Sequence, residues 1–293
     1  MDFGRVLTAM ITPMHGDGSI NFPEAQRIAE HLLDNGSDGL VVAGTTGEGA
    51  TMDKDEKLKL FATILEITKA KKAKLIAGSS SNDTAATIEL SKKAEALGVD
   101  GILAVVPYYN KPPQDSLYAH FSAVAQAVSL PIMLYNVPSR TSSNLEPTTV
   151  ALLAKIGNIV ALKESSGDMS QMSLLRILTP PDFMIYSGDD GDTLPMLSLG
   201  ACGVVSVAGH LIGNLIHDMI IAWEKGDTAQ ALELHQRCYP IFKGIFMTTS
   251  PMPVKYSLQR LGFETGRCRL PLTWLNDAQA AEMDGLLREA GLI

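Results

Sequence analysis

Polar clusters that follow short apolar runs contain the residue types needed to form and process an imine. Lys163 comes directly after the run Ile159–Leu162, so its stem should leave a buried strand. Burial and a nearby cation such as Arg140 would lower the pKa of this lysine and make its amine a nucleophile for a carbonyl carbon. Taken alone, a lysine at a strand end is more often merely solvated. The polar groups that follow the other apolar runs favour the interpretation of Lys163 as a nucleophile.

These other clusters supply hydroxyl, phenol and guanidinium groups. Thr45 and Thr46 lie between glycines and can offer hydroxyls and backbone N–H groups to a small carboxylate, or form an ordinary glycine-rich turn. Tyr109 and Tyr135 can move protons, although tyrosines more often pack in cores. Arg140 lies beside a proline-fixed turn and suits a bidentate contact with a carboxylate of a ligand. An ordinary ion pair at the protein surface explains an arginine at this position equally well.

Metal chemistry and other nucleophiles receive no support from the spacing of residues. Glu48 and the pair Asp189–Asp190 are carboxylates near the clusters, but no set of His, Asp and Glu has the spacing of a metal site. The six histidines are scattered, and no Gly-x-Ser-x-Gly segment is present. We expect a site without a metal.

Eight apolar runs of strand length alternate with helix-length amphipathic segments. The runs do not alternate with period two, which is typical of parallel strands buried on both faces. They are Val6–Ile11, Leu40–Ala43, Leu75–Ala77, Ile102–Val106, Ile132–Tyr135, Ile159–Leu162, Phe183–Tyr186 and Val204–Val207. Eight strand–helix repeats without a Gly-x-Gly-x-x-Gly turn favour a (β/α)8 TIM barrel over an open sheet. In such barrels catalytic groups gather at the C-terminal ends of strands, where these clusters lie.

The pattern changes after the eighth run. From about Asp227 onward the sequence predicts helices alone, over Ala229–Phe246, Val254–Leu261 and Ala278–Ala290. We expect residues 1–226 to form the catalytic barrel and residues 227–293 to form a helical extension packed on it.

Composition limits the partners and the compartment. The 293 residues are 46% hydrophobic with a net charge of −8, which excludes a disordered chain and makes nucleic acid and membrane surfaces poor partners. The cysteines Cys202, Cys238 and Cys268 are far apart and lack zinc or disulfide spacing. Charged residues already occur within the segment Met1–Arg5, which is too early for a signal peptide. No apolar stretch reaches the roughly 20 residues of a membrane span. We expect a cytoplasmic protein.

Four motifs resemble those of the dihydrodipicolinate synthase family, in the pyruvate-dependent class I aldolase superfamily. They are Gly44–Glu48, Pro107–Pro112, Tyr135–Thr141 and Lys163–Glu164, and the likeness runs from about Gly4 to the end, through Ser187–Asp190, Gly203–Val207 and Pro251–Lys255. The resemblance implies a lyase that condenses pyruvate with L-aspartate 4-semialdehyde to 4-hydroxy-tetrahydrodipicolinate. That reaction is the first committed step of diaminopimelate and lysine biosynthesis, and it needs no metal or organic cofactor.

The resemblance also gives the catalytic clusters their roles. Lys163 would form a covalent imine with pyruvate, and Tyr135 would donate and accept protons beside it. Thr45 and Tyr109 would complete a proton relay, with Tyr109 reaching in from a neighbouring subunit. An active dimer follows, and in this family the expected assembly is a homotetramer built as a dimer of dimers.

Substrate carboxylates are held by a second group of residues in this resemblance. Thr46 and the backbone at Val205 would hold the carboxylate of pyruvate, and Arg140 would bind that of the semialdehyde. Two alternatives stay open. A sibling aldolase or dehydratase could take a sugar acid or another aldehyde, because a few side chains decide the aldehyde. A non-catalytic barrel could merely bind keto acids, but binding alone needs no imine-forming amine such as Lys163.

Regulation is where the chain departs from its relatives. Lys54 and Lys57 stand where lysine-inhibited members carry histidines, and Ala86 stands where they carry a glutamate that binds the amino group of lysine. A cationic ligand that meets two lysines and no carboxylate binds poorly. We therefore hypothesise an enzyme that lysine does not inhibit.

Overall fold

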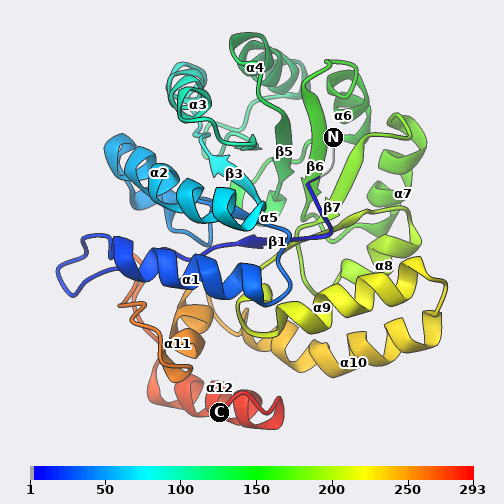
Figure 1. Ribbon diagram of the computed structural model, residues 1–293. Coiled ribbons are helices and arrows are strands. Elements are labelled where there is room, and N and C mark those ends of the chain that lie inside the picture. Colours follow the sequence, from blue (N-terminus) through cyan, green and yellow to red (C-terminus); the bar gives the residue numbers. More distant parts are fainter. Residues whose placement is uncertain (1–2) are drawn as a thin grey trace.

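The computed structural model describes residues 3–293; Met1 and Asp2, which begin the expected N-terminal segment and barrel, lie outside the described residues. Within that range, parallel strands close into a barrel in chain order from β1 to β8 (Figure 1). The strands are β1 (Val6–Ala9), β2 (Gly39–Val42), β3 (Lys74–Gly78), β4 (Gly101–Val105), β5 (Ile132–Asn136), β6 (Ile159–Glu164), β7 (Met184–Ser187) and β8 (Gly203–Ser206). The predicted TIM barrel is confirmed.

Helices surround the barrel and bury one face each against it (Figure 1). Side-chain caps mark the starts of several of them: Asp53 and Glu56 form a reciprocal capping box at the helix Lys54–Lys71, and Asp83 accepts two N–H groups at the helix Thr84–Leu97. The helices up to the last strand are α1 (Phe22–Asp34), α2 (Lys54–Lys71), α3 (Thr84–Leu97), α4 (Gln114–Ala127), α5 (Pro138–Thr141), α6 (Pro147–Leu153), α7 (Met169–Leu178) and α8 (Thr193–Ser198). No helix of residues 3–293 is long and apolar enough to cross a membrane.

Both faces of the strands are buried, which explains the missing alternation in the sequence. One apolar cluster fills the space between strands and helices, and a second, which includes Tyr135, Ala161 and Val205, fills the barrel. Successive side chains of a strand face opposite ways, so Ala161 and Lys163 face the barrel interior while Leu162 faces the helices. The strand that carries the lysine therefore delivers it to the inside of the barrel.

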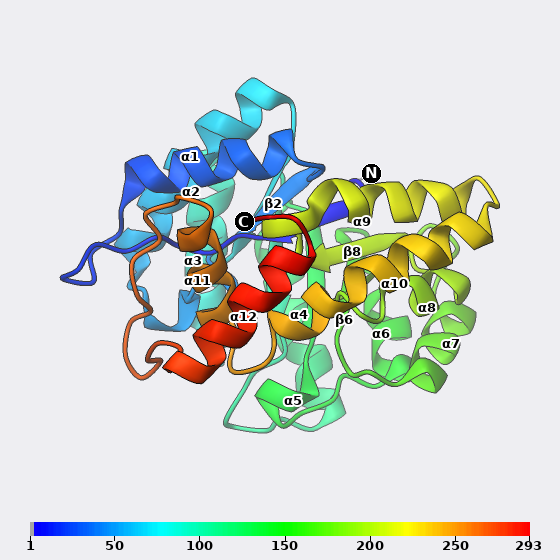
Figure 2. The same ribbon diagram turned by 90° about the horizontal axis from the view of Figure 1, so that it is seen from below.

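Further helices follow the last strand: α9 (Gly209–Glu224), α10 (Thr228–Gly244), α11 (Met252–Arg260) and α12 (Asp277–Glu289). Helix α10 packs along α9, and α12 crosses α10 and α11 on the same side of the barrel (Figure 2). The division of the chain into residues 1–226 and 227–293 stays a prediction.

His210, at the start of α9, joins the segments that directly follow the first and last strands of the barrel. Its Nε2 accepts the N–H of Ile11 at 3.0 Å, and its Nδ1 lies 2.8 Å from the carbonyl of Val207 and donates to it. The ring is 0% exposed, and burial lowers its pKa to about 4. These contacts require the neutral ring with the proton on Nδ1.

We expect this histidine to make the fold sensitive to acid. The unfolded chain, with a histidine pKa of about 6.5, binds the proton more readily than the folded chain, so stability falls as the pH drops from about 6.5 toward 4. At pH 5 the histidine contribution should be about 2 kcal/mol smaller than at pH 7. Urea unfolding of His210→Gln at both pH values should lack this part of the pH dependence.

The buried Asp190 changes the stability in the opposite direction. Burial raises its pKa to about 6, so its contribution to stability increases as the pH falls. The comparison between the wild type and His210→Gln cancels its contribution. An identical pH dependence in the two proteins would contradict the assignment to His210.

Candidate active site

The ends of β5 and β6 bring Lys163 and Tyr135 together inside the barrel. Tyr135 is the register partner of Lys163, and Nζ of the lysine lies 4.3 Å from the centroid of the tyrosine ring. Both residues are 5% exposed. Within residues 3–293, no carboxylate forms an ion pair with Lys163. A buried amine without an acidic partner keeps its nitrogen available for a carbonyl carbon.

Gly188, directly after β7, makes room for this lysine. A Cβ added to Gly188 would lie 3.0 Å from Cε and Cγ of Lys163 and 1.8 Å from Oγ of Ser165. Any other residue type would therefore displace the hydroxyl of Ser165 and crowd the lysine side chain. The Gly188 N–H also donates to the carbonyl of Glu164 at 2.7 Å, which continues the pairing of β7 with β6 past the strand end.

Glu164 faces away from the barrel interior and holds the ends of β5 and β6 together. Its carboxylate accepts the N–H of Ser166 at 2.6 Å, the amide of Asn136 at 3.0 Å and the amide of Gln171 at 3.3 Å. Burial raises the pKa of Glu164, and these hydrogen bonds oppose the rise. Asn136 in turn accepts the N–H of Leu145 at 2.9 Å. The network anchors residues 137–145, which carry Arg140. Sequence reasoning quoted Glu164 and Asn136 but missed this role, because it depends on contacts between elements.

The turn after β2 carries Thr45 and Thr46. Its backbone folds back tightly, with the Glu48 N–H donating to the Thr45 carbonyl at 3.0 Å and positive φ angles of 55° at Ala43 and 58° at Glu48. Such conformations are costly for residues other than glycine, so the surrounding structure must hold them. Thr45 is exposed, while Thr46 is 4% exposed.

A buried ion pair holds this turn in place. Nζ of Lys255, in α11, lies 2.8 Å from Oε1 of Glu48, and the two side chains are 0% and 2% exposed. Lys255 also donates to the carbonyl of Arg267 at 3.0 Å, and the second oxygen of Glu48 accepts the N–H of Arg269 at 2.8 Å. Glu48 thus joins the β2 turn to the C-terminal part of the chain, and its charge is satisfied without a metal.

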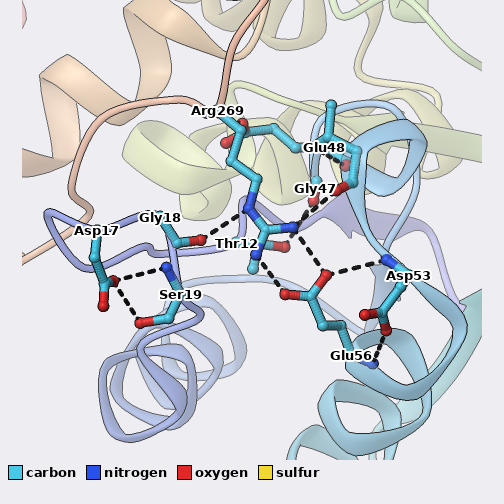
Figure 3. A network of polar contacts seen from close by, with 10 residues as sticks. Thr12, Asp17, Gly18, Ser19, Gly47, Glu48, Asp53, Glu56 and Arg269 are labelled. Atoms are coloured by element: carbon cyan, nitrogen blue, oxygen red, sulfur yellow. Dashed lines mark hydrogen bonds and ion pairs between the residues drawn. The ribbon is translucent and has the colours of Figure 1, made fainter.

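Arg269 adds a second connection between the same parts of the structure (Figure 3). Its guanidinium makes a two-point contact with Glu56 of α2, and it donates to the carbonyls of Thr51 and Gly18, each at 2.8 Å. In the same view, the hydroxyl of Thr12 reaches the carbonyl of Gly47 in the β2 turn at 2.8 Å. The loop before α12 is thereby fixed to the turn and to the start of α2.

A cavity of about 520 Å³ opens at this end of the barrel, where the strand ends meet. Its walls come from the β2 turn, from the ends of β4 and β5 and from the C-terminal part of the chain. Residues that line it include Thr45, Tyr108, Tyr135, Arg140, Thr249, Ser250, Arg269 and Leu272. Sequence reasoning treated the C-terminal helices as packing, and it missed that the loops between them form one wall of the cavity.

The other expected residues, Lys163, Thr46, Val205 and Tyr109, are not among those that line the cavity. Val205 is 0% exposed and packs in the inner core of the barrel. Tyr109 follows β4 with a positive φ of 74°, and its side chain is 89% exposed. Within this chain Tyr109 is therefore not brought together with Lys163.

Asp190, a carboxylate near the end of β7, has its hydrogen-bond partners within the chain. Asp190 is 1% exposed and accepts the N–H groups of Val207 and Ala208, at 2.9 and 3.1 Å, and the hydroxyl of Ser206. It fixes the turn between β8 and α9. No group of three or more His, Cys, Asp or Glu side chains in the described part of the chain is arranged to hold a metal ion.

A TIM barrel with a buried lysine that lies beside a tyrosine ring at the C-terminal strand ends, and that has no acidic partner among residues 3–293, has the site of a class I aldolase. The model of the dihydrodipicolinate synthetase family matches residues 2–290. This chain belongs to that family.

Proteins and structures with this family name match the chain over nearly its whole length. The 4-hydroxy-tetrahydrodipicolinate synthase of Heliobacterium modesticaldum is 52% identical and covers 100% of this chain and 97% of its own. The crystal structure of dihydrodipicolinate synthase from Cyanidioschyzon merolae with lysine bound matches with a TM-score of 0.98 and 45% identity, over 99% of each chain. The structure of a dihydrodipicolinate synthase from Bacillus anthracis matches with a TM-score of 0.96 and 43% identity, over 98% of each.

The buried ion pair should be sensitive to the loss of one partner. Lys255→Met leaves the carboxylate of Glu48 buried without its cation, and we expect the free energy of unfolding in urea to fall by about 3–5 kcal/mol. The double variant Glu48→Gln, Lys255→Met removes both charges and should recover most of that loss.

Lys54→Met serves as the matched control, because its partner Glu89 is 54% exposed and the pair lies at the surface. Removing that pair should change stability by about 1 kcal/mol or less. A Lys255→Met variant as stable as the control would show that the buried pair does not hold the turn.

Proposed function

We propose that this chain condenses pyruvate with L-aspartate 4-semialdehyde to 4-hydroxy-tetrahydrodipicolinate. The observation that carries the proposal is the buried Lys163 amine, which has no acidic partner in the described chain and lies 4.3 Å from the ring of Tyr135. The full-length similarity to proteins named 4-hydroxy-tetrahydrodipicolinate synthase supports the choice of substrates. The product enters the biosynthesis of diaminopimelate and lysine.

In the first half of the reaction Lys163 is the nucleophile. Its amine adds to the keto carbon of pyruvate, and loss of water leaves a protonated imine. This electron-poor carbon acidifies the methyl group of pyruvate, so that loss of one proton gives an enamine. We assign the movement of these protons to Tyr135 and, as its partner in the relay, to Thr45, which lines the same cavity. The covalent imine on the lysine replaces any metal or organic cofactor in this proposal.

In the second half the enamine carbon attacks the aldehyde carbon of the semialdehyde. The amine of that substrate then attacks the imine carbon, closes the ring and releases Lys163. Arg140 lines the cavity and forms no ion pair within residues 3–293, so its guanidinium is available for the carboxylate of the semialdehyde. Thr46 and the backbone at Val205 are assigned to the carboxylate of pyruvate.

The active form in this proposal is an assembly of at least two copies. Tyr109 is 89% exposed at a strained backbone position, which is an unfavourable place for a large aromatic side chain unless a partner covers it. We assign its phenol to the proton relay of a neighbouring subunit, in a homotetramer built as a dimer of dimers. We also place the protein in the cytoplasm.

Arg140→Ala should separate the two substrates. We expect kcat/KM for the semialdehyde to fall about 100-fold, because one charged two-point contact is lost from the transition state. Borohydride trapping of pyruvate on Lys163 should proceed as in the wild type. Lys163→Ala is the negative control and should trap nothing. Turnover of another aldehyde, with none of the semialdehyde, would assign the chain to a sibling aldolase; absence of any pyruvate adduct in the wild type would leave a binding protein.

The exchange of Tyr109 between subunits is open to a complementation test. Tyr109→Phe and Lys163→Ala should each be nearly inactive alone. Co-expressed in equal amounts, they should regain activity from about a quarter of the sites, since half of the dimers are mixed and each mixed dimer has one complete site. If the mixture stays as inactive as its components, Tyr109 does not act across an interface.

Lysine should leave the activity unchanged at millimolar concentration. Lys54 is paired with Glu89 at 2.7 Å, while Lys57 lines the cavity, where burial lowers its pKa, and Ala86 offers no carboxylate. The combined variant Lys54→His, Lys57→His, Ala86→Glu should become more sensitive. Inhibition of the wild type by micromolar lysine in the initial-rate assay would refute the hypothesis.

A further inference from the structure

A buried hydroxyl without a partner lies beside the lysine of the site. Oγ of Ser165 is shielded from solvent, and within residues 3–293 nothing forms a hydrogen bond with it. A buried hydroxyl in this state reduces stability, because it loses its bonds to water and gains none in return. Such a group at a strand end needs an explanation other than packing.

Ser165 is held firmly next to Lys163. It comes two residues later in the chain, so both side chains face the same side of the strand. Its N–H donates to the carbonyl of Asn136 at 2.9 Å, which extends the pairing of β6 with β5. The position that a Cβ on Gly188 would occupy lies 1.8 Å from Oγ of Ser165 and 3.0 Å from Cε of Lys163. The hydroxyl therefore lies beside the last carbon before the reactive nitrogen.

We propose that Ser165 is a further catalytic residue, whose hydroxyl donates a hydrogen bond to the oxygen that leaves during imine formation. This proposal rests on the proposed function, since it requires a keto acid on Lys163. Addition of the amine to the keto carbon forms the C–N bond and turns the keto oxygen into the hydroxyl of a carbinolamine. That hydroxyl is separated from the lysine nitrogen by one carbon atom, so it forms close to the end of the lysine side chain, beside which Oγ of Ser165 lies.

The loss of water then balances with the groups at hand. The lone pair of the nitrogen forms the C=N bond while the C–O bond breaks, and the departing hydroxide takes a proton from the phenol of Tyr135. The products are the protonated imine, a tyrosinate and one water molecule. The hydrogen bond from Ser165 stabilises the negative charge that grows on the departing oxygen, and it transfers no proton itself. A hydroxyl without a partner in the free enzyme meets this need, because it gives up no bond within the chain.

Rapid-quench borohydride trapping with pyruvate alone measures this step without the second substrate. We expect Ser165→Ala to form the trapped adduct about tenfold more slowly than the wild type, with half-saturation by pyruvate changed less than about twofold. Ser165→Cys keeps the volume of the side chain and is a weak donor, so it should be nearly as slow as Ser165→Ala. A wild-type rate in Ser165→Cys would show that only the volume matters.

Ser122→Ala is the matched control, because Oγ of Ser122 in α4 is likewise buried without a partner in the described chain but lies outside the site. Both alanine variants should unfold at the same or higher urea concentration than the wild type, and Ser122→Ala should trap pyruvate at the wild-type rate. A wild-type trapping rate in Ser165→Ala would overturn the role of Ser165 and leave the proposed function standing. A wild type that traps no pyruvate would overturn the proposed function itself.

Discussion

A shift of one residue between β5 and β6 would turn Lys163 from the barrel interior toward the helices, so the register of these two strands is the constraint on which the site depends. The register is fixed at its end by Glu164 and Asn136, which bond to each other on the outer side of the same two strands. Gly188, directly after the next strand, fits closely against the lysine. The reacting groups thus stand on paired strands of the barrel, and the polar contacts that align them lie outside the cavity.

The β2 turn depends on the C-terminal part of the chain. A buried pair such as Glu48 and Lys255 is costly to desolvate and adds little net stability, but an incomplete pair is strongly unfavourable. Such a contact favours the arrangement in which Lys255 of α11 lies against Glu48 of the turn. Arg269 adds contacts with Glu56 and with loop carbonyls, so the same segment fixes the wall of the cavity. The C-terminal helices therefore belong to the site and are more than a cover for the barrel.

Buried polar groups in this protein fall into two sets. His210, Asp190 and Glu164 have hydrogen-bond partners for their buried atoms, and each joins neighbouring elements. Lys163 forms no ion pair in the described chain, and the buried Oγ of Ser165 has no hydrogen-bond partner there. The folded state gains no polar contact from these two groups, which is common in a site prepared for a substrate. The satisfied groups supply the rigidity that keeps the unsatisfied ones in position.

The sequence by itself determined the eight strands, because runs apolar on both faces suit a parallel sheet covered by helices, and eight strand–helix repeats favoured its closure into a barrel. It also indicated Lys163, Tyr135 and Arg140, since strand ends in such a barrel point to one mouth. Only the tertiary structure decided which distant residues complete the site. Residue spacing carries no record of a contact between Glu48 and Lys255, which are 207 positions apart, because such contacts arise when separate elements pack. The exposed position of Tyr109 was likewise decided by the backbone after β4 and not by its residue type.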